Sequence, residues 1–361
     1  MNELWQRLGF LAVALIVYRI GTHIPIPGIN PEQVAALFQQ SQGTILQYFN
    51  LFSGGALERM SIFALSVVPY ISSAIVMQLF SNSLPYLQEL KKDGQSGRNK
   101  ITQYTRYGAV VFAIIQSTAL TITLQTAGLI ESTGLFSAVV AISSIVAGTI
   151  FLMWLGEQIS ERGIGNGISL IIATSIITGV PRAIGQALEQ TQQGDLNYLL
   201  LLILAILSLL VVAFVVFVEN AQRKITVNYA QRNQVRGMIQ APSSFLPLKL
   251  NMSGVIPAIF ASTFLLFPAS LSSWFGNIDG LGGLQEFSLY LNPGQPLYIL
   301  LFVVLIVSFC YIWLALTFNS QDMADNLKRG GAYIPGIRPG EQTASFIDII
   351  LSRLTVVGAF Y

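Results

Sequence analysis

Several long stretches of this 361-residue chain carry no charged side chain, and this feature limits its fold more than any other. A helix needs about 20 apolar residues to cross the hydrocarbon core of a membrane. Only 10% of the residues are charged, whereas a soluble domain has about 25%. The main charge-free windows cover residues 61–80, 107–128, 135–155, 168–181, 196–218, 253–274 and 297–318.

Two shorter windows complete the pattern. Residues 8–18 form one that ends at Arg19, and the other opens after Arg353 and stops at Tyr361. The sequence therefore predicts an all-α membrane protein with eight complete spans and the start of a ninth. We expect a chain interrupted in mid-span, because its last carbonyl groups would lie in lipid unless other protein covered them.

The basic residues predict the orientation of these spans. Fifteen of the 19 Lys and Arg residues fall in five stretches, at Arg7, 91–106, Arg162, 223–249 and 328–338. Cationic loops stay on the cytoplasmic side of a membrane. We therefore expect a cytoplasmic N-terminus and cytoplasmic loops at 81–106, 156–167, 219–252 and 319–345.

Four basic residues fall outside this pattern, namely Arg19, Arg59, Arg182 and Arg353. Each lies near a predicted span end. A long cationic side chain at such a position can extend to the membrane interface, and this is the role that we expect for all four.

The two longest basic loops exceed what a topology signal needs. In 219–252, residues 222–229 alternate like a strand, and Pro242 and Pro247 then interrupt the pattern, which predicts a projecting hairpin. Orientation of a span, or contact with anionic lipid, is the common role of a basic loop. Loops of about 30 residues favour a docking role as well.

Two similar segments indicate internal symmetry. Residues 67–71 read VVPYI and residues 255–259 read VIPAI. In a chain of ten spans they would belong to the second helices of two inverted five-span halves, and proline-broken helices at matching positions indicate a pathway at the repeat interface. Chance is the competing explanation, because short apolar runs with one proline recur in membrane helices.

The spans offer no evident catalytic or ion-coupling chemistry. They contain no central Asp, Glu, Lys or His, which argues against an ion-coupled transporter, although backbone carbonyls at broken helices can bind Na⁺. One cysteine, Cys310, and one histidine, His23, exclude a disulfide framework and a Cys/His metal cluster. Residues 163–167 (GIGNG) lack the strand and the Lys-Ser/Thr of a phosphate-binding loop, so we interpret them as a turn. No cofactor is predicted.

Other features of the sequence have two interpretations. Uncharged polar residues in the spans, such as Ser72, Gln116 and Ser262, are either ordinary interhelical hydrogen-bond partners or members of a seam that opens. Residues 45–59 are amphipathic, too short to span, and broken by Gly54 and Gly55. They form either an interfacial helix or a half-helix folded into a cavity.

Several motifs resemble the SecY family, the central subunit of the bacterial protein-conducting channel. They are FSGGA (52–56), PYI (69–71), GRNKITQYTRY (97–107), WLGEQI (154–159), GIGNGIS (163–169), NMSGVIPAIFAS (251–262) and PGIRPGEQT (335–343). The resemblance implies ten spans in two inverted halves, here residues 1–187 and 188–361, of which this chain lacks the tenth span.

The resemblance also implies a plug and an apolar pore ring. The plug that closes the resting channel from outside corresponds to residues 45–59, with Ile45, Tyr48, Phe49, Phe52, Gly54, Gly55 and Leu57 as its members. The ring corresponds to Val67, Ile71, Ile168, Ile172 and Ile259. The residues by themselves show only i, i+4 pairs on one helix face, which are usually ordinary packing. As a ring, they would seal around an extended chain and offer ions no hydration.

A lateral gate and docking residues follow from the same resemblance. Spans two, three, seven and eight resemble the gate, which carries Ser72, Gln116, Asn251, Ser262 and Thr263. The docking residues for the motor ATPase SecA and the ribosome would be Arg223, Lys224, Arg232, Arg236, Lys328, Arg329 and Arg338. Arg236 and Arg338 are the strongest candidates, because the fixed fork of a guanidinium suits rRNA phosphate or a carboxylate.

Together these features predict a passive channel and no enzyme. It would pass unfolded secretory polypeptides across the bacterial inner membrane and release apolar segments sideways into lipid, driven by a motor ATPase or a ribosome. The partners implied are SecE, SecG, SecA, the ribosome with its nascent chain, signal peptides and anionic lipid. The alternatives are a small-solute secondary transporter and a non-conducting scaffold that binds ribosomes.

Overall fold

The computed structural model describes residues 2–30, 33–36, 50, 52–126, 128–130, 134–194, 197–229, 244–262, 264–265 and 295–361. The chain separates into two compact units. The first comprises Met1–Leu196 and Thr263–Ile299, and the second comprises Asn197–Ser262 and Leu300–Tyr361.

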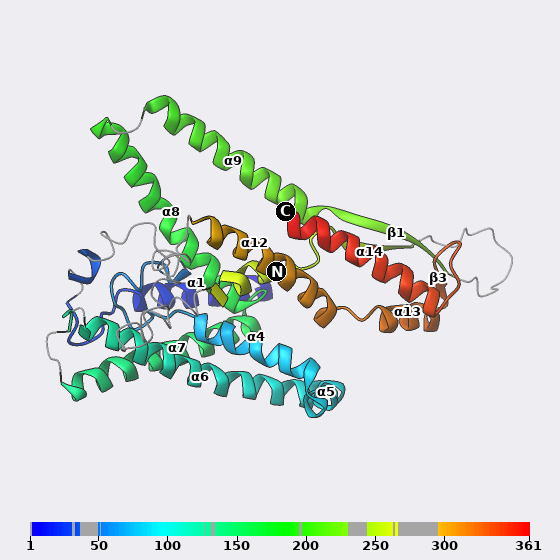
Figure 1. The fold of residues 1–361 in the computed structure, drawn as a ribbon, viewed down its shortest axis with the longest axis horizontal. Helices are drawn as coiled ribbons and strands as arrows, with labels where there is room; N and C mark the ends of the chain where they lie inside the picture. The colour runs from blue at the N-terminus through cyan, green and yellow to red at the C-terminus, as the bar shows by residue number, and fades with distance from the viewer. Residues whose placement is uncertain are drawn as a thin grey trace. The chain divides into compact units, whose positions relative to one another are not determined.

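The first unit is a helical bundle (Figure 1). Its helices are α1 (Asn2–Gly21), α4 (Val68–Ser83), α5 (Pro85–Lys92), α6 (Gly94–Thr126), α7 (Leu135–Arg162) and α8 (Gly167–Gln193). Helix α6 packs against α4, α5 and α7, while α1 packs against both α7 and α8. Neighbours in sequence are therefore mostly neighbours in space, as short connections between antiparallel helices require.

Helix α4 begins later than the charge-free window predicts. The window starts at Ser61, but residues 61–67 form turns and the helix begins at Val68. Pro69 explains the start, because proline lacks an N–H and is tolerated in the first helical turn, where no carbonyl partner exists. In the second unit the similar segment behaves in the same way, since its helical residues begin at Ile256, one residue before Pro257.

The segment 81–106, predicted as a cytoplasmic loop, is largely helical. Helix α5 and the first turns of α6 occupy it, and the chain breaks only near Leu84 and Asp93. Leu84 is extended because the residue before a proline avoids the α-region. Helix α8 likewise continues through Pro181, where the charge-free window ends, and stops at Gly194, which caps it with a positive φ of 87°.

The second unit combines helices with a small sheet. Its elements are α9 (Tyr198–Asn220), β1 (Gln222–Tyr229), β2 (Ser244–Lys249), α12 (Pro296–Thr317, from Leu300 onward), α13 (Ser320–Arg329), β3 (Ala332–Tyr333) and α14 (Glu341–Phe360). Strands β1 and β2 pair antiparallel, with Thr226 opposite Phe245, which confirms the predicted hairpin. Pro247 does not interrupt it, because β2 is an edge strand of the order β2-β1-β3, and edges tolerate proline.

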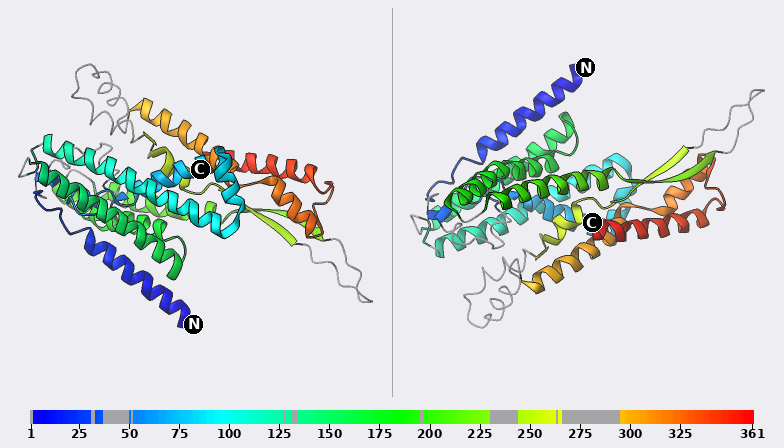
Figure 2. Two further views of the ribbon diagram at one scale, coloured as in Figure 1. Left: turned by 90° about the horizontal axis from the view of Figure 1, so that it is seen from below. Right: turned by 90° about the horizontal axis from the view of Figure 1, so that it is seen from above.

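Helix α14 corrects the ninth window. The helix begins at Glu341, not after Arg353, and it is long enough to cross a membrane. Its buried side chains recur every three or four residues, at Thr343, Ala344, Ile347, Ile350, Leu351 and Leu354. Of these, Ile347, Ile350, Leu351 and Leu354 pack in one apolar cluster with Ile225 and Val227 of the sheet. Both views of Figure 2 show α14 (red) beside α13 (orange).

Within the described residues, seven helical stretches are long and apolar enough to cross a membrane, and Val68–Ser81 is a shorter apolar helix. Helix α9 is the most exposed of them, with none of its apolar central stretch buried inside the protein. A helix that is apolar on every side requires an apolar surrounding. The chain is therefore an all-α membrane protein with a small sheet. The window at 253–274 is described only at 253–262 and 264–265.

Candidate functional site

The plug segment, residues 45–59, is buried in the first unit over the part that the structure describes. Residues 53–59 form consecutive turns, and Gly54 and Gly55 have positive φ values of 66° and 81°. Ala56 and Leu57 are 0% and 4% exposed. The interfacial helix considered for this segment is therefore wrong at 53–59, because the glycines turn the backbone inward. Ile45, Tyr48 and Phe49 lie outside the described residues.

Helices α1 and α8 hold the plug segment through one hydroxyl cluster. The hydroxyl of Tyr18 lies 2.5 Å from Ser175 Oγ and donates to the carbonyl oxygen of Ser53 at 3.2 Å. Gly54 lies so close to α8 that an added Cβ would sit 3.1 Å from the Cα atom of Ser175. Only glycine suits this position, since it combines a positive φ with the close approach.

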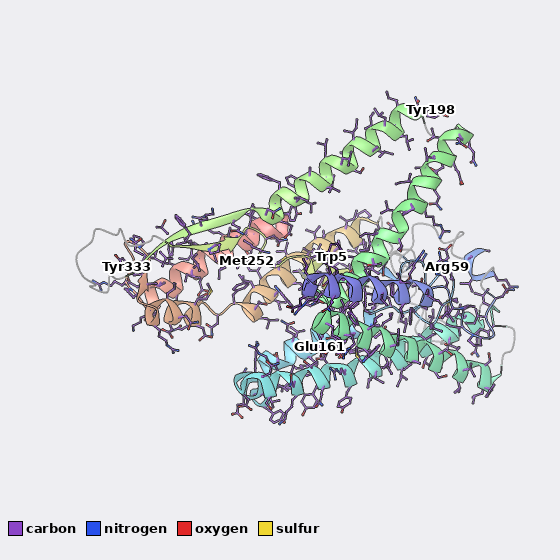
Figure 3. The ribbon with its side chains drawn as sticks, turned by 180° about the vertical axis from the view of Figure 1, so that it is seen from behind. Trp5, Arg59, Glu161, Tyr198, Met252 and Tyr333 are labelled. Atoms are coloured by element: carbon purple, nitrogen blue, oxygen red, sulfur yellow. The ribbon has the colours of Figure 1, made fainter. Side chains whose placement is uncertain are left out.

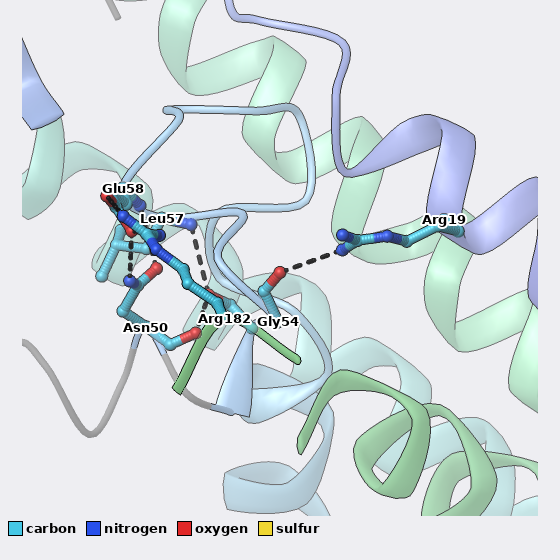
Figure 4. Close-up of polar contacts among 7 residues, drawn as sticks. Arg19, Asn50, Gly54, Leu57, Glu58 and Arg182 are labelled. Carbon is cyan, nitrogen blue, oxygen red and sulfur yellow. Dashed lines mark hydrogen bonds and ion pairs between the residues drawn. The ribbon is translucent and has the colours of Figure 1, made fainter. Parts of the chain in front are cut away.

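Charged side chains add a second set of contacts (Figure 4). Arg182 on α8 donates two hydrogen bonds to the Glu58 carboxylate, at 2.7 and 2.8 Å, and Asn50 donates a third at 3.0 Å. The Glu58 N–H donates to the side-chain oxygen of Asn50 at 3.0 Å. Arg19 on α1 donates to the carbonyl oxygen of Gly54 at 3.2 Å. The carboxylate thus accepts three hydrogen bonds from two side chains.

The surroundings of Glu58 favour its charged form. The hydrogen bonds from Arg182 lower the pKa of Glu58 below its ordinary value of 4.5, against the opposing effect of burial. Arg19 and Arg182, which we expected to extend to the membrane interface, instead have partners inside the protein. Arg353 is exposed on α14, as that expectation requires.

Backbone pairing joins the connection after α1 to the turns that precede α4. The N–H of Ile26 donates to the carbonyl oxygen of Met60 at 2.9 Å, and that of Ile62 donates to Ile24 at 3.0 Å. Met60 has a φ of 43°, which is strained for a residue with a side chain. The turns leading into α4 are therefore tied to the end of α1.

Four of the five predicted ring residues meet in one apolar cluster of the first unit. Val67 is 2% exposed, and Ile71, Ile168 and Ile172 pack partly buried against the same cluster. Ala56 of the plug segment belongs to that cluster as well. The fifth residue, Ile259, is partly buried in the second unit.

A capped turn positions the second pair of ring residues at the start of α8. The side-chain oxygen of Asn166 accepts hydrogen bonds from the N–H groups of Ile168 and Ser169, at 3.1 and 3.2 Å. The hydroxyl of Ser160 accepts from the N–H of Gly167 at 2.8 Å. The GIGNG run is therefore an ordered helix start, and Gly163 and Gly167 lie in close contact with α7.

The described gate residues have hydrogen-bond partners, with the exception of one buried amide oxygen. Ser72 and Ser262 donate to carbonyl oxygens one helical turn earlier. Asn251 donates to Glu219 at 2.9 Å and accepts from the N–H of Gly254. Gln116 differs, because its buried side-chain oxygen has no hydrogen-bond partner among the described residues. Thr263 lies outside those residues.

The predicted docking residues gather on one part of the second unit, which we call the basic platform. It consists of the three-stranded sheet, α13, α14 and the connection between β3 and α14. The predicted docking residues exposed on it are Arg223, Lys224, Lys328, Arg329 and Arg338, and Lys249 and Arg353 are exposed there as well. The turn at Arg338 is held where the Thr343 hydroxyl donates to the Arg338 carbonyl oxygen at 2.9 Å. Arg232 and Arg236 lie outside the described residues.

Sequence reasoning missed four residues that hold the plug segment: Tyr18, Glu58, Ser175 and Arg182. One signal could have found two of them. Arg19, Arg59 and Arg182 depart from the charge pattern, and the plug segment contains Glu58 as the acid between them. Tyr18 and Ser175 carry no such signal, because hydroxyl groups are frequent in membrane helices.

The chain is similar to proteins of one family. The family model described as SecY matches residues 61–361. The protein translocase subunit SecY of Pseudomonas aeruginosa is 57% identical over 361 residues, which covers 100% of this chain and 82% of that protein. The corresponding subunit of Escherichia coli is 55% identical over 365 residues, with the same coverage.

Solved structures share the fold at lower identity. The structure of a protein-conducting channel has a TM-score of 0.65 at 19% identity and covers 99% of this chain and 84% of its own. A SecY structure described by its plug domain, which stabilises the closed state, has a TM-score of 0.60 at 18% identity with the same coverage. Sec61 in a canine ribosome–channel complex has a TM-score of 0.61 at 16% identity, also with that coverage.

Proposed function

This chain belongs to the SecY family, and from that premise we propose how its residues conduct polypeptides. It is the channel subunit of a protein translocase. Unfolded secretory polypeptides pass through it, and apolar segments leave sideways into lipid. Energy comes from a cytoplasmic motor or a translating ribosome, because the residues described hold no group suited to capture it in the membrane.

One observation carries this function: a segment without regular structure is buried against the apolar cluster that holds the proposed ring residues. Ala56 packs in the same cluster as Val67, Ile71, Ile168 and Ile172. A closed channel needs such an insert, since branched apolar side chains seal against a second surface and leave ions without hydration. Removal of the insert would leave an apolar ring able to fit an extended chain.

Cross-linking of a stalled nascent chain tests the channel directly. A photoreactive residue at Ile71 or Ile172 should cross-link to the translocating polypeptide, whereas one at Ile177, which is 65% exposed on α8, should not. A small-solute transporter predicts no cross-link at any of these positions. A ribosome-binding scaffold predicts ribosome binding without cross-links at Ile71 or Ile259.

The basic platform is the proposed docking site of SecA and the ribosome. Its cations are exposed on elements that α14 holds rigidly, which supports a contact surface. A solved channel of this fold is bound to a ribosome. Arg338→Glu should block precursor export while the protein still inserts and folds, since the reversed charge repels rRNA phosphate or a motor carboxylate. Normal export by this variant in vesicles would contradict the role. The control is Arg353→Glu, which reverses an exposed cation on α14 that is not one of the predicted docking residues.

The remaining assignments belong to the same proposal. Two inverted halves, 1–187 and 188–361, are supported by the helix starts at Val68 and Ile256, each one residue before a proline. The proposed membrane is the bacterial inner membrane, with the N-terminus in the cytoplasm. SecE and SecG are the proposed small subunits, and signal peptides and anionic lipid are further partners. Gln116 remains the best gate candidate, because a buried amide oxygen without a partner favours rearrangement.

A further inference from the structure

Three of the four basic residues that depart from the charge pattern converge on the plug segment. Arg19 ends α1, Arg59 follows Glu58, and Arg182 lies in α8. In Figure 3, Arg59 lies toward one end of the first unit, whereas Trp5 and Glu161 lie away from it. Glu58 is the only acidic residue among positions 52–67. The Glu58 carboxylate therefore interacts with Arg182 and Arg59, while Arg19 binds the carbonyl oxygen of Gly54 in the same segment.

The contact between Glu58 and Arg182 is the strongest charged contact in this cluster. Two parallel hydrogen bonds, at 2.7 and 2.8 Å, fix both planar groups. The Glu58 side chain is 11% exposed and the Arg182 side chain 52%, so the carboxylate is the partner that has lost its water. If Arg182 is removed, the Glu58 carboxylate stays buried without its partner. The free-energy cost of that unpaired charge is larger than the stabilisation that an exposed ion pair contributes.

Arg59 makes the cluster depend on Glu58. Its side chain lies over Gly55, where an added Cβ would sit 3.7 Å from Nη2. Its Nη1 atom is buried and has no hydrogen-bond partner among the described residues. Burial lowers the pKa of Arg59, and the charge of Arg19 acts in the same direction. Without Glu58, three cations would remain together around the plug segment and would repel one another.

We propose that Glu58 and Arg182 form a latch that positions the plug segment in the closed channel, and that the strength of this latch sets how strongly a signal sequence must act to open it. The proposal rests on the proposed channel function. Glu58 and Arg182 are positioning residues, since they touch no substrate. Opening would exchange two hydrogen bonds within the protein for bonds to water, without displacing the apolar core of the helices.

The latch can be tested in the complete translocase reconstituted in planar bilayers. The two variants are Glu58→Gln and Arg182→Gln, and the readouts are the resting ion current and the export of a precursor with a weakened signal sequence. We expect each variant to raise the resting current by about two- to fivefold, which is the range expected for loss of a partly exposed pair.

A matched control separates the latch from general damage. Arg106 and Glu157 form an ion pair of the same length, 2.8 Å, between α6 and α7 of the same unit. Arg106→Gln should leave the resting current and the signal requirement unchanged. The exchange Glu58→Arg with Arg182→Glu should restore part of the closed state, which a merely destabilised fold would not do.

Two results would overturn the latch. One is a resting current in both single variants equal to that of the wild type. The other is an equal rise in the Arg106→Gln control. If Glu58→Gln fails to fold, Arg182→Gln and the exchanged pair still decide the question. Failure of the channel function would be distinct, since the wild-type translocase would then export no normal precursor.

Discussion

The plug segment and the basic platform are built in opposite ways. The plug segment has turns instead of regular structure over 53–59, yet it is buried and is held by a few directional polar contacts beside the apolar contacts of Ala56 and Leu57. The basic platform has strands and helices joined by a continuous apolar cluster, and its cations are exposed. Breaking a few polar contacts that water can replace costs little, whereas separating an apolar cluster exposes it to water. The plug segment is therefore suited to movement, whereas the basic platform is suited to keep its structure while a partner binds it.

The largest expected effect lies in the basic platform. Ile347 is 0% exposed between α14 and the sheet. Ile347→Ala should lower the free energy of unfolding of this unit by about 2–5 kcal/mol, because it leaves a cavity in the apolar cluster. Protease digestion of the β1–β2 hairpin should become faster. Ile349→Ala is the control, since Ile349 is 53% exposed on the same helix. Equal digestion of both variants would show that the platform is not held as a rigid body.

An intermediate effect is expected at Gly54. Gly54→Ala should destabilise the closed position of the plug segment by about 1–3 kcal/mol. The new Cβ meets Ser175, and the φ of 66° is strained for alanine. The resting ion current should rise while the thermal stability of the bundle stays nearly unchanged. Gly128→Ala is the control, because Gly128 has a φ of 70° but no neighbour within 4 Å. If both variants leak equally, the contact with α8 does not hold the plug.

The smallest effect is expected from pH. The folded-state pKa of Glu58 lies below 4.5, so its contribution to the closed state is fully present above pH 4.5 and is lost as the pH falls through the folded-state pKa. Arg182 and Arg59 are the charged groups that act on it, and both favour its charged form. The resting current should therefore rise on acidification below pH 4.5. The current of Glu58→Gln should show no such pH-dependent rise.

Much of the fold could be predicted from local sequence. Charge-free windows located most of the membrane helices, and the alternation at 222–229 predicted the hairpin that β1 and β2 form. The pairs Val67/Ile71 and Ile168/Ile172 were expected to share a function, and the structure brings all four into one cluster. The two prolines misled the prediction of element boundaries. Pro181 lies inside α8, where neighbouring residues continue the helix. Pro247 lies in β2, which tolerates proline because it is an edge strand.

The start of α14 shows why composition was insufficient there. Asp348 and Arg353 interrupt the apolar run, so the window placed the helix too late. In the folded unit the Ser320 hydroxyl donates to the Asp348 carboxylate, and the apolar face of the helix covers the sheet. Ser320, which is distant in sequence, thus provides a hydrogen bond that allows the charged Asp348 within α14.

The sequence by itself determined which segments enter lipid, because transfer of a helix into a membrane depends mainly on its own residues. Membership of the SecY family also follows from the sequence. Only the tertiary structure decided how the plug segment is held. Glu58 and Arg182 are 124 residues apart, and Tyr18 and Ser175 are 157 apart. No local pattern specifies such pairs, since their energy arises only when packing removes water from both partners.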